Sequence, residues 1–182
     1  DREELPASAL HTPGDSTRPA AELEVLYRIA EEAVQPSVPL EVLLQRILDL
    51  TLSAVGDDRG CVLLVDPVTS EIKPTAVRGA VSTDPAGRMP VSRSIVEHVR
   101  KTGQGVLTTD ARHDRRFDTA ESIVQAGIRA AMCVPVQGRN ALLGVVYVDT
   151  TMAADALLLG NAPPRFSEEQ LRLLWAIGRQ AA

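Results

Sequence analysis

The chain has 182 residues and a formal charge of −5, and 45% of its residues are hydrophobic, 24% charged and 3% aromatic. This length suits one domain, and the composition is that of a globular protein rather than a disordered one. Two Phe, two Tyr and one Trp offer few platforms for stacked bases, and the negative charge repels phosphate. Nucleic acid is therefore not expected as a partner.

The cysteine usage and the lengths of the apolar runs bear on the compartment. Cys61 and Cys133 both lie in apolar runs, and two isolated thiols are no disulfide framework, so a cytoplasmic location is expected. No apolar run approaches the ~18 residues of a membrane span, and no membrane partner is predicted. Because the sequence begins with Asp and ends in an expected helix, we expect it to be a piece of a longer protein.

The first half of the chain predicts a linker, two helices and a hairpin. Residues 1–20 are rich in Pro, Ser and Thr without periodicity, which indicates a linker. A helix is expected from about Ala20, and a second one follows Ser37 and ends at Gly56. The apolar run 61–65 predicts a central strand, with its hairpin partner over 71–79. The first helix carries a heptad-like stripe of Leu23, Leu26, Ala30 and Ala33.

The second half predicts a helix, a strand, a short helix, a hairpin and a last helix. A short strand is expected over 88–91, and Ser92 is placed to cap a helix that Gly103 closes. A strand over 106–109 leads to a polar loop and then to a short helix through Ile123. Two apolar strands, 131–136 and 141–148, form a hairpin. The last helix begins with a capping box from Ser167 to Gln170 and carries a stripe of Leu171, Leu174, Ile177 and Ala181.

This order of elements predicts an α+β domain over residues 21–182. Hairpins impose antiparallel pairing, and the connections are too short for repeated parallel crossovers. We expect a central, mainly antiparallel sheet of five to six strands. The terminal helices cover one face, and the middle helices and loops cover the other.

No pattern of residues in the chain indicates catalysis. A phosphate-binding glycine loop, a hydrolase elbow and a zinc-protease helix are all missing from the sequence. Asp110, His113 and Asp114 could ligate a metal, but a solvated loop balanced by arginines explains them better, and no metal is predicted. The neighbouring Arg112, Arg115 and Arg116 could hold a phosphate or pair with these acids.

An ordered series of short segments runs through the middle and end of the chain. It reads Met89-Pro-Val-Ser-Arg-Ser-Ile-Val96, Gly105-Val-Leu-Thr-Thr-Asp-Ala-Arg112, Ser122-Ile-Val-Gln-Ala-Gly-Ile-Arg129, Met132-Cys-Val-Pro-Val136 and Leu143-Gly-Val-Val-Tyr-Val-Asp149, and it closes on Phe166-Ser-Glu-Glu-Gln-Leu171. This series resembles a GAF domain over roughly residues 21–182. The variant is most similar to GAF domains found next to forkhead-associated, sigma-54 activator, cyclase or kinase domains in bacterial signalling proteins.

The resemblance implies a non-catalytic sensory module that binds an unknown small molecule between the sheet and the middle helices. Its ligand-binding residues would be Leu63, Ser94, Ile95, Asp110, Phe117, Asp118, Ser122, Ile123, Gln125, Met132 and Tyr147. The resemblance also implies a homodimer through the terminal helices. The dimerisation residues would be Leu23, Leu26, Ala30, Ala33, Leu174 and Ile177.

Departures from the family's best-known variants narrow these expectations. Cyclic-nucleotide GAF domains carry an Asn-Lys pair and an Asp-Glu pair around a Phe; here Phe166 matches, but Asp149-Thr150 and Gln170-Leu171 replace the pairs. Bilin-binding relatives need a Cys followed by His, and methionine sulfoxide reductases of this fold need several pocket cysteines. Cys61 and Cys133 meet neither requirement. The cofactor is therefore left unknown. A ligand-free dimeric relay is the first alternative function, and cyclic-nucleotide binding is the second.

Overall fold

The computed structural model describes residues 18–33, 38–56, 59–79, 91–117, 127–151 and 166–180. Within these ranges it confirms the α+β architecture, with one antiparallel sheet between helical layers. Several predicted features lie outside them, wholly or in part. These are most of the linker, all but Val91 of the predicted strand at 88–91, and the short helix through Ile123.

Five strands of the described residues form the sheet in the order β2-β1-β5-β4-β3. Every neighbouring pair is antiparallel. Strand β1 pairs on both sides, as its apolar run predicted, and both predicted hairpins are present. The strands are β1 (Gly60–Val65), β2 (Ile72–Arg78), β3 (Val106–Thr108), β4 (Ile128–Gln137) and β5 (Leu142–Thr151).

Helices α2 (Leu40–Val55) and α5 (Glu168–Gln180) cover one face of the sheet. The expected capping box begins α5: the Ser167 N–H donates to Gln170 Oε1 at 2.8 Å, and the Gln170 N–H donates to Ser167 Oγ at 3.2 Å. The Gln170 amide also donates to the carbonyl of Val55 at 2.8 Å, which ties the start of α5 to the end of α2. The capping residue therefore joins the two helices as well as starting one.

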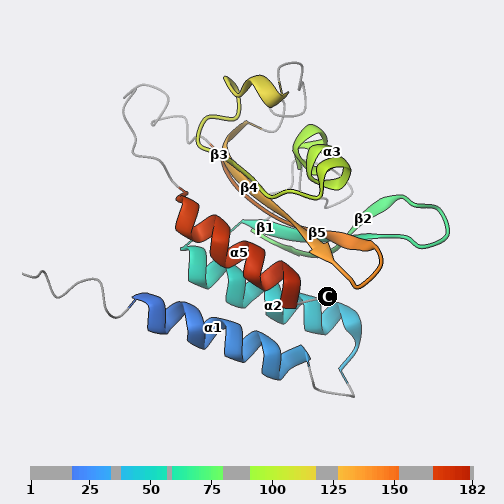
Figure 1. Cartoon of the computed structure of the whole chain (residues 1–182), viewed down its shortest axis with the longest axis vertical. Helices are drawn as coiled ribbons and strands as arrows, with labels where there is room; N and C mark the ends of the chain where they lie inside the picture. Colours follow the sequence, from blue (N-terminus) through green and yellow to red (C-terminus); the bar gives the residue numbers. More distant parts are fainter. Residues whose placement is uncertain are drawn as a thin grey trace, which may run out of the picture.

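Helix α1 (Arg18–Ala33) packs on α2 and α5 as an outer layer (Figure 1). Among the α1 side chains that the structure describes, Ile29 is fully buried, whereas Leu23 of the predicted stripe is 53% exposed. Leu26 is only partly buried against this chain's own core. The stripe read from the spacing is therefore rotated relative to the face that α1 buries.

Two residues predicted for dimerisation lie in the core of this chain. Leu174 and Ile177 of α5 have no exposed surface, because α5 presses them against the sheet and against α1 and α2. Burial in this chain's own core corrects the expectation that these two residues contribute to dimerisation. The side chain of Ala33 lies outside the described residues.

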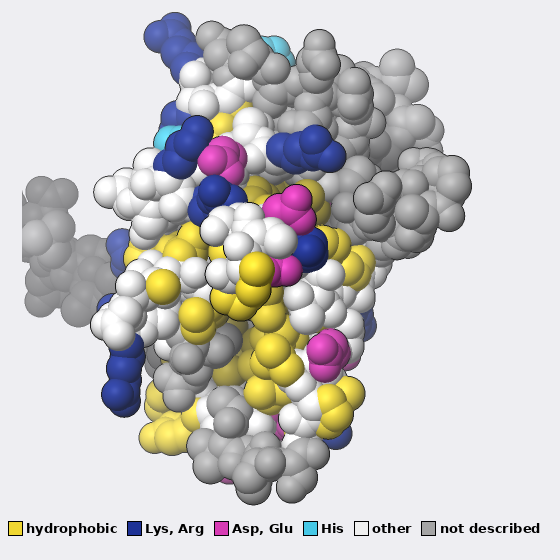
Figure 2. Space-filling view, turned by 90° about the vertical axis from the view of Figure 1, so that its right-hand side faces the viewer, with side chains coloured by type: hydrophobic (Ala, Val, Ile, Leu, Met, Phe, Trp, Pro, Cys, Tyr) yellow, Lys and Arg dark blue, Asp and Glu magenta, His cyan; other side chains and the backbone are white. Residues whose placement is uncertain are grey.

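Helix α3 (Arg93–Thr102) covers the other face of the sheet. Ser92 caps its start, accepting from the Ile95 N–H at 3.3 Å, and Gly103 ends it in the left-handed conformation at φ 64°. Both ends are as predicted. The face that carries the hairpin turns shows hydrophobic side chains among charged ones (Figure 2). Val68, in the turn between β1 and β2, is 90% exposed.

Candidate functional site

Four of the predicted ligand-binding residues meet under α3. Leu63, Ile95, Phe117 and Tyr147 belong to one buried cluster, and none of them is more than 5% exposed. They come from β1, α3, the 3₁₀ turn η1 (Arg115–Phe117) and β5. The sequence therefore correctly grouped four residues from separate elements into one apolar cluster, which we call the apolar floor.

Met132 does not belong to this floor. Successive side chains of a strand point to opposite faces, and here Ala131 and Cys133 point toward α3 while Met132 packs with the α2 and α5 cluster. The expectation that Met132 lies beside Leu63 and Tyr147 is therefore wrong by one strand position. Cys133 occupies the position in the floor that was expected for Met132.

A chain of polar contacts crosses the apolar floor beneath the start of α3. The Tyr147 hydroxyl donates to Asp149 Oδ2 at 2.8 Å, and it accepts from the Ser92 N–H at 3.4 Å. The hydroxyl oxygens of Ser92 and Ser94 lie 2.9 Å apart. Burial, and then the neighbouring Asp149 charge, raises the pKa of Tyr147 well above its usual value, so the phenol keeps its proton.

The same chain of contacts ends in a buried ion pair. Arg59 Nε lies 2.6 Å from Asp149 Oδ1, and the Asp149 side chain has no exposed surface. Arg59 comes from the connection between α2 and β1 and is itself 13% exposed. We call the set Ser94, Ser92, Tyr147, Asp149 and Arg59 the buried polar network.

Sequence reasoning did not identify Arg59 or Asp149 as candidate site residues. The signal was available for the carboxylate: an Asp follows the apolar run Val145-Val-Tyr-Val148, two positions after a Tyr, so the two side chains share a face. A buried carboxylate in such a run needs a partner with donors. No sequence pattern singled out Arg59, which lies 90 positions earlier.

The loop before η1 forms its own network at the edge of this layer. Arg116 pairs with Asp114 at 2.6 Å and donates to the carbonyl of Leu107 at 2.7 Å. Its guanidinium lies 5.3 Å from the Phe117 ring centre, and the His98 ring meets the same ring edge-on at 5.6 Å. These contacts hold Phe117 against α3.

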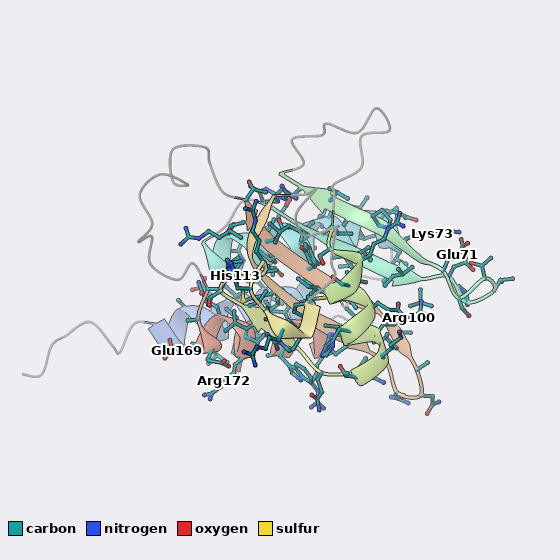
Figure 3. All side chains as sticks on the ribbon, turned by 90° about the horizontal axis from the view of Figure 1, so that it is seen from above. Glu71, Lys73, Arg100, His113, Glu169 and Arg172 are labelled. Carbon is teal, nitrogen blue, oxygen red and sulfur yellow. The ribbon has the colours of Figure 1, made fainter. Side chains whose placement is uncertain are left out.

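Asp110 lies apart from the floor. Its carboxylate contacts His113 Nδ1 at 2.9 Å, and the two side chains are 60% and 83% exposed. Figure 3 shows His113 among the labelled side chains.

No group of three or more metal-ligating side chains comes together in the part of the chain that the structure describes. The predicted residues Asp118, Ser122, Ile123 and Gln125 lie outside the described residues.

The two cysteines flank Tyr147 in neighbouring strands. Cys61 and Cys133 each pair with Tyr147 in register, so they lie two strand spacings apart, roughly 9.5 Å. That separation is too large for a disulfide. Burial raises the pKa of both thiols far above the usual value, so neither offers a thiolate nucleophile.

The fold and this site define an α+β domain with a buried polar network under one helix of an antiparallel sheet. A sequence model of the GAF domain matches residues 39–182, and the chain belongs to the GAF family. GAF domains are generally regulatory modules rather than enzymes. The resemblance to a GAF domain that the ordered motifs indicated is therefore confirmed.

Solved structures share this fold at low sequence identity. The GAF domain of an Acinetobacter phosphoenolpyruvate-protein phosphotransferase is 22% identical, with a TM-score of 0.65 over 88% of this chain and 89% of that one. The phycocyanobilin-bound GAF domain of a cyanobacterial phytochrome is 16% identical (TM-score 0.65, covering 88% and 91%). Free methionine-R-sulfoxide reductase from Neisseria meningitidis is 20% identical (TM-score 0.57, covering 95% and 96%).

No protein of curated function matched the sequence. Among the described residues, no helix has the length and apolar character needed to cross a membrane.

Proposed function

We propose that this chain is a non-catalytic regulatory module that senses a small molecule at the start of α3 and relays its state through the terminal helices. The observation that carries the proposal is the buried polar network. It connects Ser94, at the start of the helix that lines the site, with Arg59, at the end of the connection from α2.

The chemistry at the start of α3 suits a small polar ligand with an apolar part. Ser94 is half-buried, and its hydroxyl contacts that of Ser92, so a ligand oxygen or nitrogen could join this pair. Leu63, Ile95 and Phe117 supply the apolar surface beneath it. Such mixed lining, mostly apolar with a few placed polar groups, is typical of ligand sites.

The relay follows from what the network connects. A ligand shifts a conformational equilibrium only by its difference in affinity for the two states. A ligand that draws the Ser92 and Ser94 hydroxyls toward itself changes the surroundings of the Tyr147 hydroxyl. This hydroxyl is hydrogen-bonded to Asp149, which in turn is ion-paired with Arg59. Movement at Arg59 then reaches the end of α2, on which α1 and α5 pack.

A thermal-shift screen tests the sensing role. The panel consists of cyclic nucleotides, amino acids and small carboxylates, because these present the polar groups that the serine pair can bind. A ligand at about 100 times its Kd stabilises the folded state by about 2.7 kcal/mol. We expect at least one compound to raise the Tm, and Ser94→Ala to remove that rise.

Ser53→Ala is the matched control, because Ser53 is an exposed residue of α2, remote from the site, whose hydroxyl donates to the Asp49 carbonyl. The rise in Tm should survive in this variant. A panel in which no compound stabilises the protein contradicts the sensing role, as does a Tm rise that Ser94→Ala leaves intact.

The non-catalytic part of the proposal rests on the thiols. The likeness to the methionine sulfoxide reductase concerns the fold, and both cysteines of this chain are buried with raised pKa values. We propose a cytoplasmic location and flanking signalling domains for the same module. Reduction of free methionine sulfoxide by the purified chain would contradict the non-catalytic role.

A ligand-free dimeric relay is the second candidate, and the outer face of α1 favours it. Leu23 and Tyr27 lie one helical turn apart and are 53% and 65% exposed, which leaves an apolar strip on the outermost helix. Sedimentation equilibrium tests it: the wild type should dimerise, and the double variant Leu23→Glu/Tyr27→Glu should be monomeric. A monomeric wild type at high concentration contradicts this role.

A further inference from the structure

A second concave site lies at the opposite end of α3 from Ser92. The two ends of this ten-residue helix are roughly 15 Å apart. The site is an open groove of about 760 Å³ where the C-terminal half of α5 meets the end of β4 and the β4–β5 turn. Its lining residues are Gly103, Pro135, Gln137, Gly138, Arg139, Trp175 and Arg179.

The groove is positively charged in a chain that is negative overall. Arg139 lies in the β4–β5 turn and Arg179 in the last turn of α5, both exposed, and none of the described residues that line the groove is Asp or Glu. Neither guanidinium makes an ion pair with any residue that the structure describes. The C-terminal ends of α3 and α5 contribute about −0.5 charge each, so the two arginines still leave an excess of about +1.

Trp175 is the aromatic residue among the described residues that line the groove. Trp175 is half-buried and packs against the backbone of Gly105, where a Cβ atom would lie 2.7 Å from the ring. Only a residue without a side chain allows this approach. The ring is therefore held in place from behind while it lines the groove.

We propose that this groove binds a nucleoside diphosphate or triphosphate. Guanidinium groups bind phosphate oxygens in pairs of hydrogen bonds, and Arg139 and Arg179 approach the groove from separate elements. The indole of Trp175 packs against the base, and the Gln137 amide is placed to bond a polar edge of it. The volume falls within the roughly 300–1,000 Å³ of small-molecule sites.

This site is separate from the one proposed at the start of α3, and neither proposal depends on the other. Trp175 is the one tryptophan of the whole sequence, so intrinsic tryptophan fluorescence reports on the groove alone. The probes are ADP, pyrophosphate and adenosine, each titrated into the purified chain. Isothermal calorimetry provides the same constants without interference from adenine absorbance.

We expect saturable binding of ADP with a change in Trp175 fluorescence, and binding of pyrophosphate at least about fivefold weaker because the indole contact is lost. Adenosine should not bind measurably. Arg139→Gln and Arg179→Gln should each weaken ADP binding about fivefold or more, as expected for the loss of a charged hydrogen-bond donor.

Arg172→Gln is the matched control: it makes the same charge change at an exposed residue of α5, two helical turns before Arg179 and outside the groove lining. ADP affinity should stay within about twofold in this variant, because an exposed charge that distant is largely screened. Absence of saturable ADP binding overturns the proposal. So does equal binding by the Arg139→Gln/Arg179→Gln double variant, or pyrophosphate binding as tight as that of ADP.

Discussion

The phenol of Tyr147 and the carboxylate of Asp149 form a 2.8 Å hydrogen bond, and neither side chain has any exposed surface. The two residues lie two positions apart on β5, so their side chains leave the same face of the strand. Because the phenol keeps its proton, Tyr147 acts as a donor to the carboxylate and as an acceptor for the Ser92 N–H. One side chain thus joins the sheet to the start of α3.

Tyr147→Phe should destabilise the fold by about 1–3 kcal/mol, because it leaves the buried Asp149 carboxylate short of a donor. Tyr27→Phe is the control, since Tyr27 is 65% exposed and the sequence holds only these two tyrosines. Urea unfolding followed by circular dichroism measures both variants. Equal midpoints for Tyr147→Phe and the wild type would contradict a structural role for this hydroxyl.

The Arg59–Asp149 pair should behave as a buried ion pair, in which removing one partner is costly. We expect Arg59→Met or Asp149→Asn to cost about 3–5 kcal/mol, and the double variant to cost less than the sum of the two. The surface pair Arg78–Asp49 is the comparison, at 3.0 Å with both side chains nearly half exposed.

Breaking the Arg78–Asp49 pair should cost less than about 1 kcal/mol. A double-mutant cycle measured by urea unfolding supplies both coupling energies. Similar coupling energies for the two pairs would contradict the prediction, because they would mean that burial of Asp149 does not strengthen its ion pair with Arg59.

The fold was predictable wherever local chemistry decides it. The Ser167 capping box, the Ser92 cap and Gly103 each satisfy orphan backbone groups at a helix end, and these signals are local in sequence. Hairpin strands likewise follow from apolar runs beside turn residues. The inward face of α1 was not predictable in this way, because Leu23 and Ile29 are both apolar and only the position of α2 and α5 selects between them.

The candidate site was harder to read, because it depends on strand register and on distant pairs. Met132 and Cys133 are adjacent and both buried, and a shift of one position exchanges their faces. The apolar floor could still be assembled, since Ile95 and Phe117 occupy positions that the family resemblance marks. The Arg59–Asp149 pair could not, because nothing local in the sequence joins residues 90 positions apart.

Asp114 should make the stability of the wild type depend on pH. Its hydrogen bond from Arg116, the largest cause, and one from the Arg116 backbone lower the pKa of Asp114 from 3.8 to about 2. A carboxyl with a lowered folded-state pKa stabilises the fold above its unfolded pKa of about 4 and loses this effect as the pH falls toward 2.

Asp114→Asn should therefore be less stable than the wild type at neutral pH, and the difference should shrink between about pH 4 and pH 2. Urea unfolding across this range measures the difference. Asp110→Asn serves as the control for a 60% exposed carboxylate in the same loop. A gap between Asp114→Asn and the wild type that is the same at pH 3 and pH 7 would contradict the assignment.

Gly178 allows α5 to approach the sheet closely. A Cβ atom at this position would lie 2.7 Å from the Pro135 carbonyl oxygen and 3.3 Å from a methyl of Val134. Inside a helix, Gly→Ala ordinarily stabilises by about 1 kcal/mol. Here the overlap with backbone should reverse the sign, and we expect Gly178→Ala to destabilise by about 1–3 kcal/mol as α5 moves away from β4.

Ala176→Gly on the same helix separates packing from helix propensity. It should cost about 1 kcal/mol, because propensity alone favours alanine at that position. Urea unfolding of both variants then gives two losses from opposite substitutions. If propensity governed both positions, Gly178→Ala would raise the unfolding midpoint, and that result would show that α5 does not rest on the Pro135 carbonyl.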